Sequence, residues 1–313
     1  MKLRAAVVGV GYLGQFHAQK YKQLSETQFQ GQLELVGVCD LNADQAKKVG
    51  ESLGVQWFTH PKDLIGKVDM VAIASVTLAH YELAKLFLEN NIHVNVEKPI
   101  TEKVSQAQEL VKLAKEKNLI LCVGHSERFN PAFVEAQRRM TKPLWVENHR
   151  HAPFKSRGAD VSVIHDLMIH DIDMLLSLDQ SPCRVVSAQG GSLITKTYDW
   201  ASATFEFQSG LKALITTSRV AQQMTRSMKI IEKNQVIEAN LQTGDLVVTQ
   251  IGTAGESLQF TSHQSGKGDN LLIETEAFIK AVLKKAPSVI TGQDGLRALE
   301  MVEQVIACIK SLS

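Results

Sequence analysis

The sequence lacks the features that mark several large classes of protein. Its four cysteines are scattered without a C-x-x-C pair, which is typical of buried thiols in a reducing compartment. No stretch reaches the ~18 apolar residues of a membrane span, and the first apolar run meets glycine too soon for a signal peptide. Lys and Arg number 34 against 33 Asp and Glu, so no excess charge favours nucleic acid. We therefore expect a cytoplasmic protein that binds neither membranes nor nucleic acid.

The strongest positive signal is the run from Gly9 to Gly14, G-V-G-Y-L-G, between the apolar residues 5–8 and an amphipathic stretch. Strand, glycines and helix in this order are the context that the dinucleotide fingerprint requires. Gly9 would allow a tight turn, Gly11 the approach of a pyrophosphate, and Gly14 close packing of the helix on the strand. The alternative is a glycine-rich turn in some other α/β protein. The fingerprint is favoured because a second apolar strand, ending in Asp40, follows at a suitable distance.

Asp40 indicates which dinucleotide is bound. A carboxylate at the end of the second strand accepts hydrogen bonds from both ribose hydroxyls and repels a 2′-phosphate. Leu41 and Asn42 supply no arginine to hold that phosphate. We therefore expect NAD rather than NADP. In the alternative interpretation, Asp40 is the N-cap of a helix that starts near Ala43.

The pattern of apolar and polar residues changes after residue 124. Before it, apolar strands alternate with amphipathic helices, which predicts βαβ units and a doubly wound parallel sheet of Rossmann type. From about Leu144, apolar and polar residues alternate between turn residues, which predicts a large, mostly antiparallel open sheet. We thus expect an α/β chain with an NAD-binding domain at 1–124 and an α+β domain at 125–313. Helices are expected at 165–178, 271–285 and 293–311, and a loop at 262–269, while the C-terminal helix is a candidate to pack back on the first domain.

Lys98 is the first candidate for chemistry. It follows an apolar strand of the parallel sheet, and ligands bind beyond the carboxyl ends of such strands. Lys98 would therefore lie beside the nicotinamide, where it could donate or accept a proton or hold a substrate hydroxyl. The alternative is an ordinary exposed lysine in a loop.

The second candidate is the stretch around His170. At 100° per residue, Asp166, His170 and Asp173 fall on one helix face, and a carboxylate one turn from an imidazole can orient it for proton transfer. The alternative is a polar face with a solvated histidine. His165 and His170 are about 140° apart around the helix, so they cannot easily share an ion, and we expect no metal.

These motifs together resemble the Gfo/Idh/MocA oxidoreductase family: the fingerprint at Gly9–Gly14, the tripeptide Glu97-Lys98-Pro99, and an Asp-x-x-x-His pair on a later helix. The resemblance implies a Rossmann domain that holds NAD(P) and a second domain that binds a sugar, inositol or similar polyol. Its open sheet commonly forms the subunit interface, so a homodimer or homotetramer is expected. The resemblance assigns Lys98, Asp166 and His170 as catalytic residues. With the fingerprint, the expected cofactor contacts are Gly9, Gly11, Tyr12, Leu13, Gly14, Asp40, Ser75, Val76, Thr77, His80, Glu97 and Lys98.

Three further stretches, at 125–131, 157–161 and 217–220, are similar to a branch that oxidises C3 of UDP-N-acetylglucosamine for the amino sugars of lipid A or surface glycans. Between residues 128 and 157 there are seven Lys and Arg but only two Asp and Glu. This local surplus of positive charge suits a phosphate-bearing substrate. The alternative is a solvated basic helix face around Arg138 and Arg139. The expected substrate contacts are Arg128, Arg157, Asp160 and His165, although His165 stands where an apolar residue is more usual.

The mechanistic hypothesis has His170, oriented by Asp166, accept the proton of the C3 hydroxyl while Lys98 holds that hydroxyl or stabilises the oxyanion. Three alternatives stay open: a dehydrogenase of a free sugar or inositol, an NAD-dependent glycosidase on the same fold, and a non-catalytic nucleotide sensor.

Overall fold

The computed structural model describes residues 2–156, 158–251 and 258–312. The chain forms two compact units. The first comprises the residues up to Ser126 together with Leu271–Leu296, and the second comprises Glu127–Asn270 together with the chain from Arg297 onward. No helix of the described residues is both long and apolar enough to cross a membrane.

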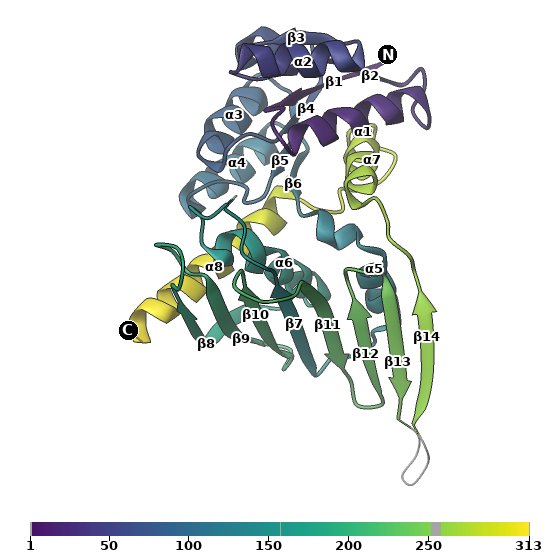
Figure 1. Cartoon of the computed structure of the whole chain (residues 1–313). Helices are drawn as coiled ribbons and strands as arrows, with labels where there is room; N and C mark the ends of the chain where they lie inside the picture. Colours follow the sequence, from purple (N-terminus) through teal and green to yellow (C-terminus); the bar gives the residue numbers. More distant parts are fainter. Residues whose placement is uncertain (1, 157, 252–257, 313) are drawn as a thin grey trace. The chain divides into compact units, whose positions relative to one another are not determined.

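The first unit is built on a six-stranded parallel sheet (Figure 1). Its strand order, β3-β2-β1-β4-β5-β6, reverses between β1 and β4, which is the arrangement that creates a ligand crevice at the carboxyl ends of the strands. The predicted doubly wound parallel sheet is therefore confirmed. The elements are β1 (Leu3–Val8), α1 (Gly14–Glu26), β2 (Leu33–Cys39), α2 (Ala43–Leu53), β3 (Gln56–Phe58), η1 (Pro61–Leu64), β4 (Met70–Ile73), α3 (Thr77–Glu89), β5 (His93–Glu97), α4 (Val104–Glu116) and β6 (Leu121–Gly124). The short helix η2 (Ser126–Phe129) starts at the last residue of this segment and belongs mostly to the second unit.

A late segment of the chain completes this first unit. Helix α7 (Asn270–Val282) places Phe278 and Ile279 in the same apolar core as Tyr21 and Leu24 of α1. The N-terminal turn of α8 (Gly292–Leu312) packs on β6, because a Cβ at Gly295 would stand only 2.5 Å from a methyl of Val123. The division thus differs from the expected boundary at 124/125, since burying two large side chains of α7 outweighs continuity of the chain.

The second unit contains an eight-stranded sheet of order β14-β13-β12-β11-β7-β10-β9-β8. Every neighbouring pair is antiparallel except β7 and β10, so the prediction of a mostly antiparallel sheet is confirmed. Ser262 to Gln264, expected in a loop, instead pair with β13 as the end of β14. The strands are β7 (Trp145–His151), β8 (Cys183–Gly191), β9 (Trp200–Phe207), β10 (Lys212–Ser218), β11 (Thr225–Ile231), β12 (Gln235–Asn240), β13 (Asp245–Gln250) and β14 (Gln259–Gln264).

Helices of the second unit cover one face of this sheet (Figure 1). They are α5 (Pro131–Arg139), the single π-helical turn η3 (Ile164–Met168), α6 (Ile169–Leu178) and the body of α8. Met168, Ile172 and Val302 are fully buried against strand residues such as Phe205. The helix expected over 165–178 exists, but it opens with a wider turn whose side chains do not follow the 100° spacing.

The return of α7 to the first unit predicts a large cost for shortening Phe278, which is 2% exposed. Phe278→Ala should lower the free energy of unfolding by about 3–5 kcal/mol because it removes a buried ring and leaves a cavity. The measurement is urea unfolding followed by far-UV circular dichroism. The control is Phe260→Ala on β14, whose ring is 67% exposed and should change stability by less than about 0.5 kcal/mol. Equal effects of the two substitutions would contradict the packing described for α7.

Candidate active site

Of the three glycines in the turn between β1 and α1, only Gly11 has open space beside its Cα, where a pyrophosphate could approach. A Cβ at Gly9, whose φ is +81°, would stand 2.7 Å from the backbone nitrogen of Ser75, and one at Gly14 would stand 1.7 Å from the Gly9 carbonyl oxygen. A Cβ at Gly11 would meet nothing within 4 Å. Leu13, at the N-cap of α1, provides no side-chain cap; the Gln15 and Phe16 amides donate to the carbonyl oxygens of Gly11 and Leu13, and the positive end of the helix dipole faces the turn. The roles predicted for the three glycines thus fit a bound dinucleotide.

Asp40 stands beside this turn at the end of β2. Its Oδ2 accepts a hydrogen bond from the Val10 backbone nitrogen at 2.9 Å, and its Oδ1 accepts one from the Asn42 backbone nitrogen at 2.9 Å. Asn42, not Asp40, caps α2, because the Asn42 side chain accepts from the Gln45 backbone nitrogen. The alternative interpretation of Asp40 as the helix cap is therefore wrong. Its carboxylate is only partly buried, which suits an acceptor for ribose hydroxyls.

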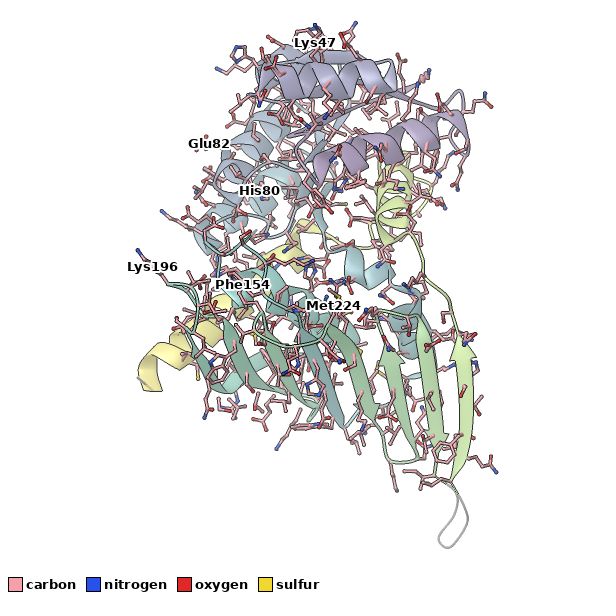
Figure 2. All side chains as sticks on the ribbon, in the orientation of Figure 1. Lys47, His80, Glu82, Phe154, Lys196 and Met224 are labelled. Carbon is pink, nitrogen blue, oxygen red and sulfur yellow. The ribbon has the colours of Figure 1, made fainter. Side chains whose placement is uncertain are left out.

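The segment after β4 presents a further predicted cofactor surface. Val76 is 71% exposed, and Tyr12 on the neighbouring glycine turn is 63% exposed. His80 differs from them, since it is 1% exposed and its two ring nitrogens lie 2.9 Å from the Pro99 oxygen and 3.1 Å from the Ser75 oxygen. Figure 2 shows His80 within the unit, in contrast to Glu82, which points outward from the same helix. His80 thus ties together the loops after β4 and β5.

Burial lowers the pKa of His80, although the hydrogen bonds to the Pro99 and Ser75 carbonyls oppose that shift. The ring holds the Ser75-Val76-Thr77 segment in register with the Lys98-Pro99 turn. Its own contact with a cofactor stays a prediction.

Glu97 is the ionised member of a buried cluster directly before Lys98. Its Oε1 lies 2.8 Å from His17 Nε2 on α1, and its Oε2 accepts from the Lys98 backbone nitrogen at 3.3 Å. Glu274 of α7 joins the cluster and accepts from Asn95 Nδ2 at 3.1 Å. The cluster therefore connects β5, α1 and α7 beneath the turn that carries Lys98.

The charges in this cluster are balanced by protons. Burial raises the pKa of Glu274 to about 8, and the negative charge of Glu97 adds to the shift. Burial alone would also raise the pKa of Glu97, but the hydrogen bond and charge of His17 hold that pKa below its usual value. Burial would lower the pKa of His17, and the bond from Glu97 raises it instead. Near neutral pH Glu274 therefore favours its protonated form, while Glu97 favours its ionised form beside His17.

His17, Glu97 and Glu274 also offer three ligand atoms that lie within 4.8 Å of one another, the usual donors for a divalent cation. Sequence reasoning did not identify this trio, because its members lie 80 and 177 residues apart. Two of the three donors are already engaged with each other, since His17 Nε2 lies 2.8 Å from Glu97 Oε1. The expectation that the protein uses no metal stays a prediction.

In the second unit, Asp166 lies in the π-helical turn η3 and His170 in the first turn of α6, and both are half-buried. The loop before them approaches closely, since a Cβ at Gly158, whose φ is +74°, would stand 3.6 Å from Asp166 Oδ2. Asp173, predicted on the same face, is 1% exposed and forms two hydrogen bonds with Arg128, at 2.6 and 2.7 Å. It therefore serves a buried ion pair with Arg128.

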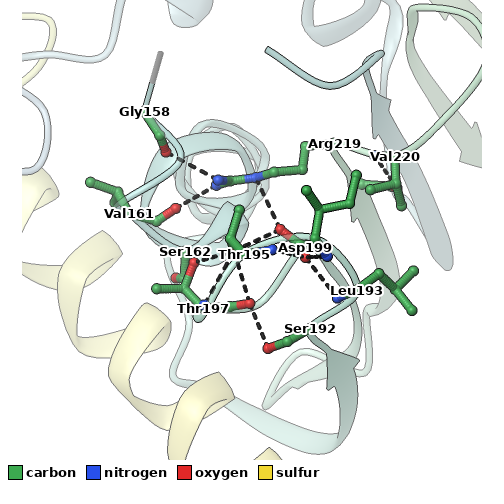
Figure 3. Close-up of polar contacts among 12 residues, drawn as sticks. Gly158, Val161, Ser162, Ser192, Leu193, Thr195, Thr197, Asp199, Arg219 and Val220 are labelled. Carbon is green, nitrogen blue, oxygen red and sulfur yellow. Dashed lines mark hydrogen bonds and ion pairs between the residues drawn. The ribbon is translucent and has the colours of Figure 1, made fainter. Parts of the chain in front are cut away.

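The loop beside Asp166 is fixed by Arg219 (Figure 3). The Arg219 guanidinium donates to the carbonyl oxygens of Gly158, at 3.0 Å, and Val161, and lies 3.9 Å from Asp199 Oδ1. Asp199 accepts three backbone N–H bonds from Leu193, Ile194 and Thr195. Burial would raise the pKa of Asp199, but these bonds hold it far below its usual value. Two of the sequence stretches singled out above, 157–161 and 217–220, are thus in contact.

The basic residues counted between 128 and 157 are largely paired with carboxylates of the protein. Arg138 and Arg139 bond to Glu135 on the surface of α5, as the alternative interpretation of that helix face has it. Arg150 is 3% exposed and forms ion pairs with Asp171 and Glu127. With Arg128, four of the seven basic residues are thus bonded to carboxylates of the protein.

The remaining predicted substrate contacts are placed as follows. Asp160 is exposed, and His165 is half-buried with its ring nitrogens near Ser162 Oγ and Glu303 Oε1. Arg157 lies outside the described residues. The assignment of these residues and of Arg128 to a substrate stays a prediction.

A doubly wound sheet with this glycine turn and an acid at the end of β2 defines a dinucleotide-binding domain. Residues 3–125 match the model of an oxidoreductase family with an NAD-binding Rossmann fold, and residues 131–238 match the GFO/IDH/MocA C-terminal domain. The chain therefore belongs to the Gfo/Idh/MocA family of NAD-binding oxidoreductases, as the motifs predicted.

Among its relatives is the UDP-N-acetylglucosamine 3-dehydrogenase of Acidithiobacillus ferrooxidans, 32% identical over 99% of this chain and 98% of that protein. The solved structure of that enzyme has a TM-score of 0.90 and covers 99% of both chains. The myo-inositol 2-dehydrogenase of Thermotoga maritima is 26% identical over 95% of this chain and 93% of its own. A levoglucosan dehydrogenase in complex with NADH and levoglucosan shares the fold, with a TM-score of 0.88 at 17% identity, covering 100% of this chain and 98% of its own.

Gly11 and Gly14 separate cofactor binding from folding. Gly11→Ala should leave the melting temperature unchanged and weaken NAD binding about 10- to 100-fold, because its methyl occupies the approach of the pyrophosphate. Gly14→Ala should cost about 1–3 kcal/mol of stability through the clash with the Gly9 carbonyl. Isothermal titration with NAD and thermal unfolding provide the two readouts. Wild-type affinity in Gly11→Ala would contradict the proposed path of the pyrophosphate.

The pKa of Glu274 predicts how stability depends on pH. Between about 4.5 and about 8 the native state keeps a proton on Glu274 that the unfolded state has released, so the free energy of unfolding should fall as pH rises. Glu274→Gln should remove that slope, which for one full proton is about 1.4 kcal/mol per pH unit. Urea unfolding at several values from pH 5 to 8.5 measures it. Glu276→Gln on the same helix is the control and should keep the wild-type slope; an unchanged slope in Glu274→Gln would contradict the assignment.

Proposed function

We propose that this protein is a cytoplasmic dehydrogenase that uses NAD to oxidise the C3 hydroxyl of a UDP-N-acetyl-hexosamine, supplying a ketone for amination in amino-sugar synthesis. The observation that carries the proposal is the full-length similarity to the UDP-N-acetylglucosamine 3-dehydrogenase of A. ferrooxidans, 32% identical and with a TM-score of 0.90. The inositol dehydrogenase is more distant, at 26% identity.

The first unit would hold NAD along the edge built by the glycine turn, Asp40 and the segment 75–77. NAD, when bound, supplies the acceptor for the hydride. Asp40 would bind the adenosine ribose, and the uncapped start of α1 would bind the pyrophosphate. Lys98 follows β5 at the carboxyl edge of the same sheet, where the substrate hydroxyl is expected. The buried Glu97 beside it fixes the backbone from which Lys98 extends.

In the second unit, His170 would accept the hydroxyl proton and Asp166 would orient the imidazole. Their location in a π-helical turn and the helical turn after it supports this assignment, since π-turns are frequent at functional sites. The Gly158 loop held by Arg219 and Asp199 restricts the Asp166 carboxylate. Lys98 would hold the hydroxyl or stabilise the oxyanion while the proton leaves.

Replacement of His170 tests the assignment. With UDP-N-acetylglucosamine and NAD, His170→Asn and Lys98→Met should each lower kcat about 10²- to 10⁴-fold, the usual contribution of general acid–base catalysis. The double variant should lose much less than the product of the two effects, because the groups act on one proton transfer. NADH formation at 340 nm is the readout, and His60→Asn, an exposed histidine, is the control. Wild-type kcat in His170→Asn would overturn its role.

The substrate is identified by a parallel assay with UDP-N-acetylglucosamine, N-acetylglucosamine and myo-inositol. Stoichiometric NADH with the sugar–phosphate bond intact supports the proposed reaction. Turnover of inositol alone would favour the relatives that are inositol dehydrogenases. Bond cleavage without accumulation of NADH would indicate a glycosidase, and NAD binding without turnover of any compound would indicate a sensor.

We further propose that the protein forms a homodimer or homotetramer through the sheet of the second unit. On the side of the sheet not lined by helices, Trp145, Leu214 and Ile231 are only partly buried within one chain. Apolar side chains on a broad sheet face are typical of a subunit interface. Light scattering coupled to size-exclusion chromatography determines the number of subunits.

A further inference from the structure

A cavity of about 180 Å³ opens in the second unit where α5, the β12–β13 turn and the segment after β14 meet. Arg226 of β11 and Lys267 of that segment both line it, and Glu127 is the carboxylate in its wall. Glu127 and Lys267 lie in stretches named in the sequence analysis, 125–131 and 262–269, but their meeting with Arg226 was not predicted, because the three residues are 99 and 41 positions apart. A hydrated group the size of a phosphate has room in this volume, since one water takes about 30 Å³ in the liquid.

The one carboxylate in the wall is already neutralised. Glu127 lies 3.3 Å from Arg150 Nη2 through one oxygen and 3.6 Å from Arg226 Nη1 through the other. Arg150 in turn forms a two-bond ion pair with Asp171. Two arginines thus face two carboxylates, and the ammonium of Lys267, with no carboxylate within ion-pair distance among the described residues, leaves the cavity positive. An anion entering it would meet a net attraction.

Polar groups in the wall lack partners as well. Among the described residues, no acceptor takes the backbone N–H of Gly266, Lys267 or Gly268, three consecutive amides of a lining segment that turns at Gly266 with φ +70°. Successive free amides at such a turn are typical of anion-binding concavities. Asn270 Oδ1 is buried beside them without a hydrogen-bond donor, so an occupant carrying a hydroxyl would satisfy it.

The segment is held in place by backbone contacts. The Ser265 backbone nitrogen donates to the Gly244 oxygen at 3.0 Å, and a Cβ at Gly244 would stand 2.1 Å from the Gly266 oxygen. A Cβ at Gly268 would stand 2.7 Å from Pro131 Cγ. The segment is therefore held against the β12–β13 turn and the start of α5.

The surroundings of Arg226 support the same conclusion. Burial lowers the pKa of Arg226, and the charge of nearby Arg150 adds to that shift, while Glu127 and Asp171 oppose it. Because Asp171 follows His170 directly on α6, the ion-pair chain Asp171–Arg150–Glu127–Arg226 joins the proposed catalytic helix to the cavity.

We propose that this cavity binds the diphosphate of a nucleoside diphosphate sugar, with Lys267, Arg226 and the amides of 266–268 as its donors. The inference rests on the proposed function for the identity of the sugar and deepens it by naming the site that recognises the nucleotide part. A free sugar or inositol carries no group for these donors. The cavity therefore acts as a specificity determinant and takes no part in proton or hydride transfer.

Calorimetric titration of the full-length protein with UDP, in the absence of sugar, tests this site directly. Lys267→Gln is the main variant, since this exposed side chain can change without disturbing the core, and Arg226→Gln is the second. Each should weaken UDP binding about 10- to 100-fold. The control is Lys229→Gln on the same strand; Lys229 forms an ion pair with Glu238, and its replacement should leave UDP binding unchanged. Affinities within twofold of wild type in both cavity variants, or no UDP binding by the wild type, would overturn the inference.

Kinetics separate this inference from the proposed function. If the wild type oxidises UDP-N-acetylglucosamine, Lys267→Gln should raise KM about 10- to 100-fold with kcat preserved. Turnover with an unchanged KM in both variants would refute the cavity and leave the proposed function intact. Lys267-dependent UDP binding without any sugar oxidation would support the cavity and refute the function.

Discussion

A single buried negative charge, that of Glu97, fixes the carboxyl end of strand β5 in the first unit. An ionised carboxylate out of water is costly unless it is paired and hydrogen-bonded. His17 supplies the positive charge and the Lys98 backbone supplies an N–H, so strand β5 ends at a defined point relative to α1. A second carboxylate in the same space, Glu274, cannot also ionise at neutral pH and keeps its proton instead. The position of Lys98 thus depends on an electrostatic balance reached by three distant segments of the chain.

The second unit uses charge in two different ways. Arg128 and Arg150 form ion pairs with carboxylates of α6, and Arg219 donates to a carbonyl oxygen of the loop before it. Arg226 ends the same ion-pair chain and, with Lys267, lines the cavity that we propose binds an anion. Arginine suits the first use because its planar fork bonds two oxygens at once. The distinction between fixing a site and binding a ligand therefore depends on which carboxylates are already present.

Local patterns in the sequence predicted the local features of this structure. The turn at Gly9–Gly14, the acid Asp40 and the alternating βαβ segments each carry a short sequence signature, so they could be predicted although the contacts they make, such as Gly9 with Ser75 and Asp40 with Val10, are long-range. Long-range pairings were not predictable in this way. The packing of α7 in the first unit and the pair of Arg128 with Asp173 join residues far apart in the chain, and no window of consecutive residues contains both partners. The π-helical turn at Asp166 likewise leaves no periodic signature, because it is a single irregular turn.

Strand β7 gives the eight-stranded sheet an unusual order of assembly. It pairs in parallel with β10 and antiparallel with β11, strands that begin 67 and 80 residues further along. On either side of it the strands follow one another as simple meanders, β8 to β10 and β11 to β14. Each meander is formed by strands that follow one another in the chain. The two meanders are joined only through β7, which lies between β10 and β11. Because closing such long loops slows folding, the pairing of β7 with β10 and β11 should be the last step in forming the sheet. In a nascent chain, β7 should be the strand that stays unpaired longest.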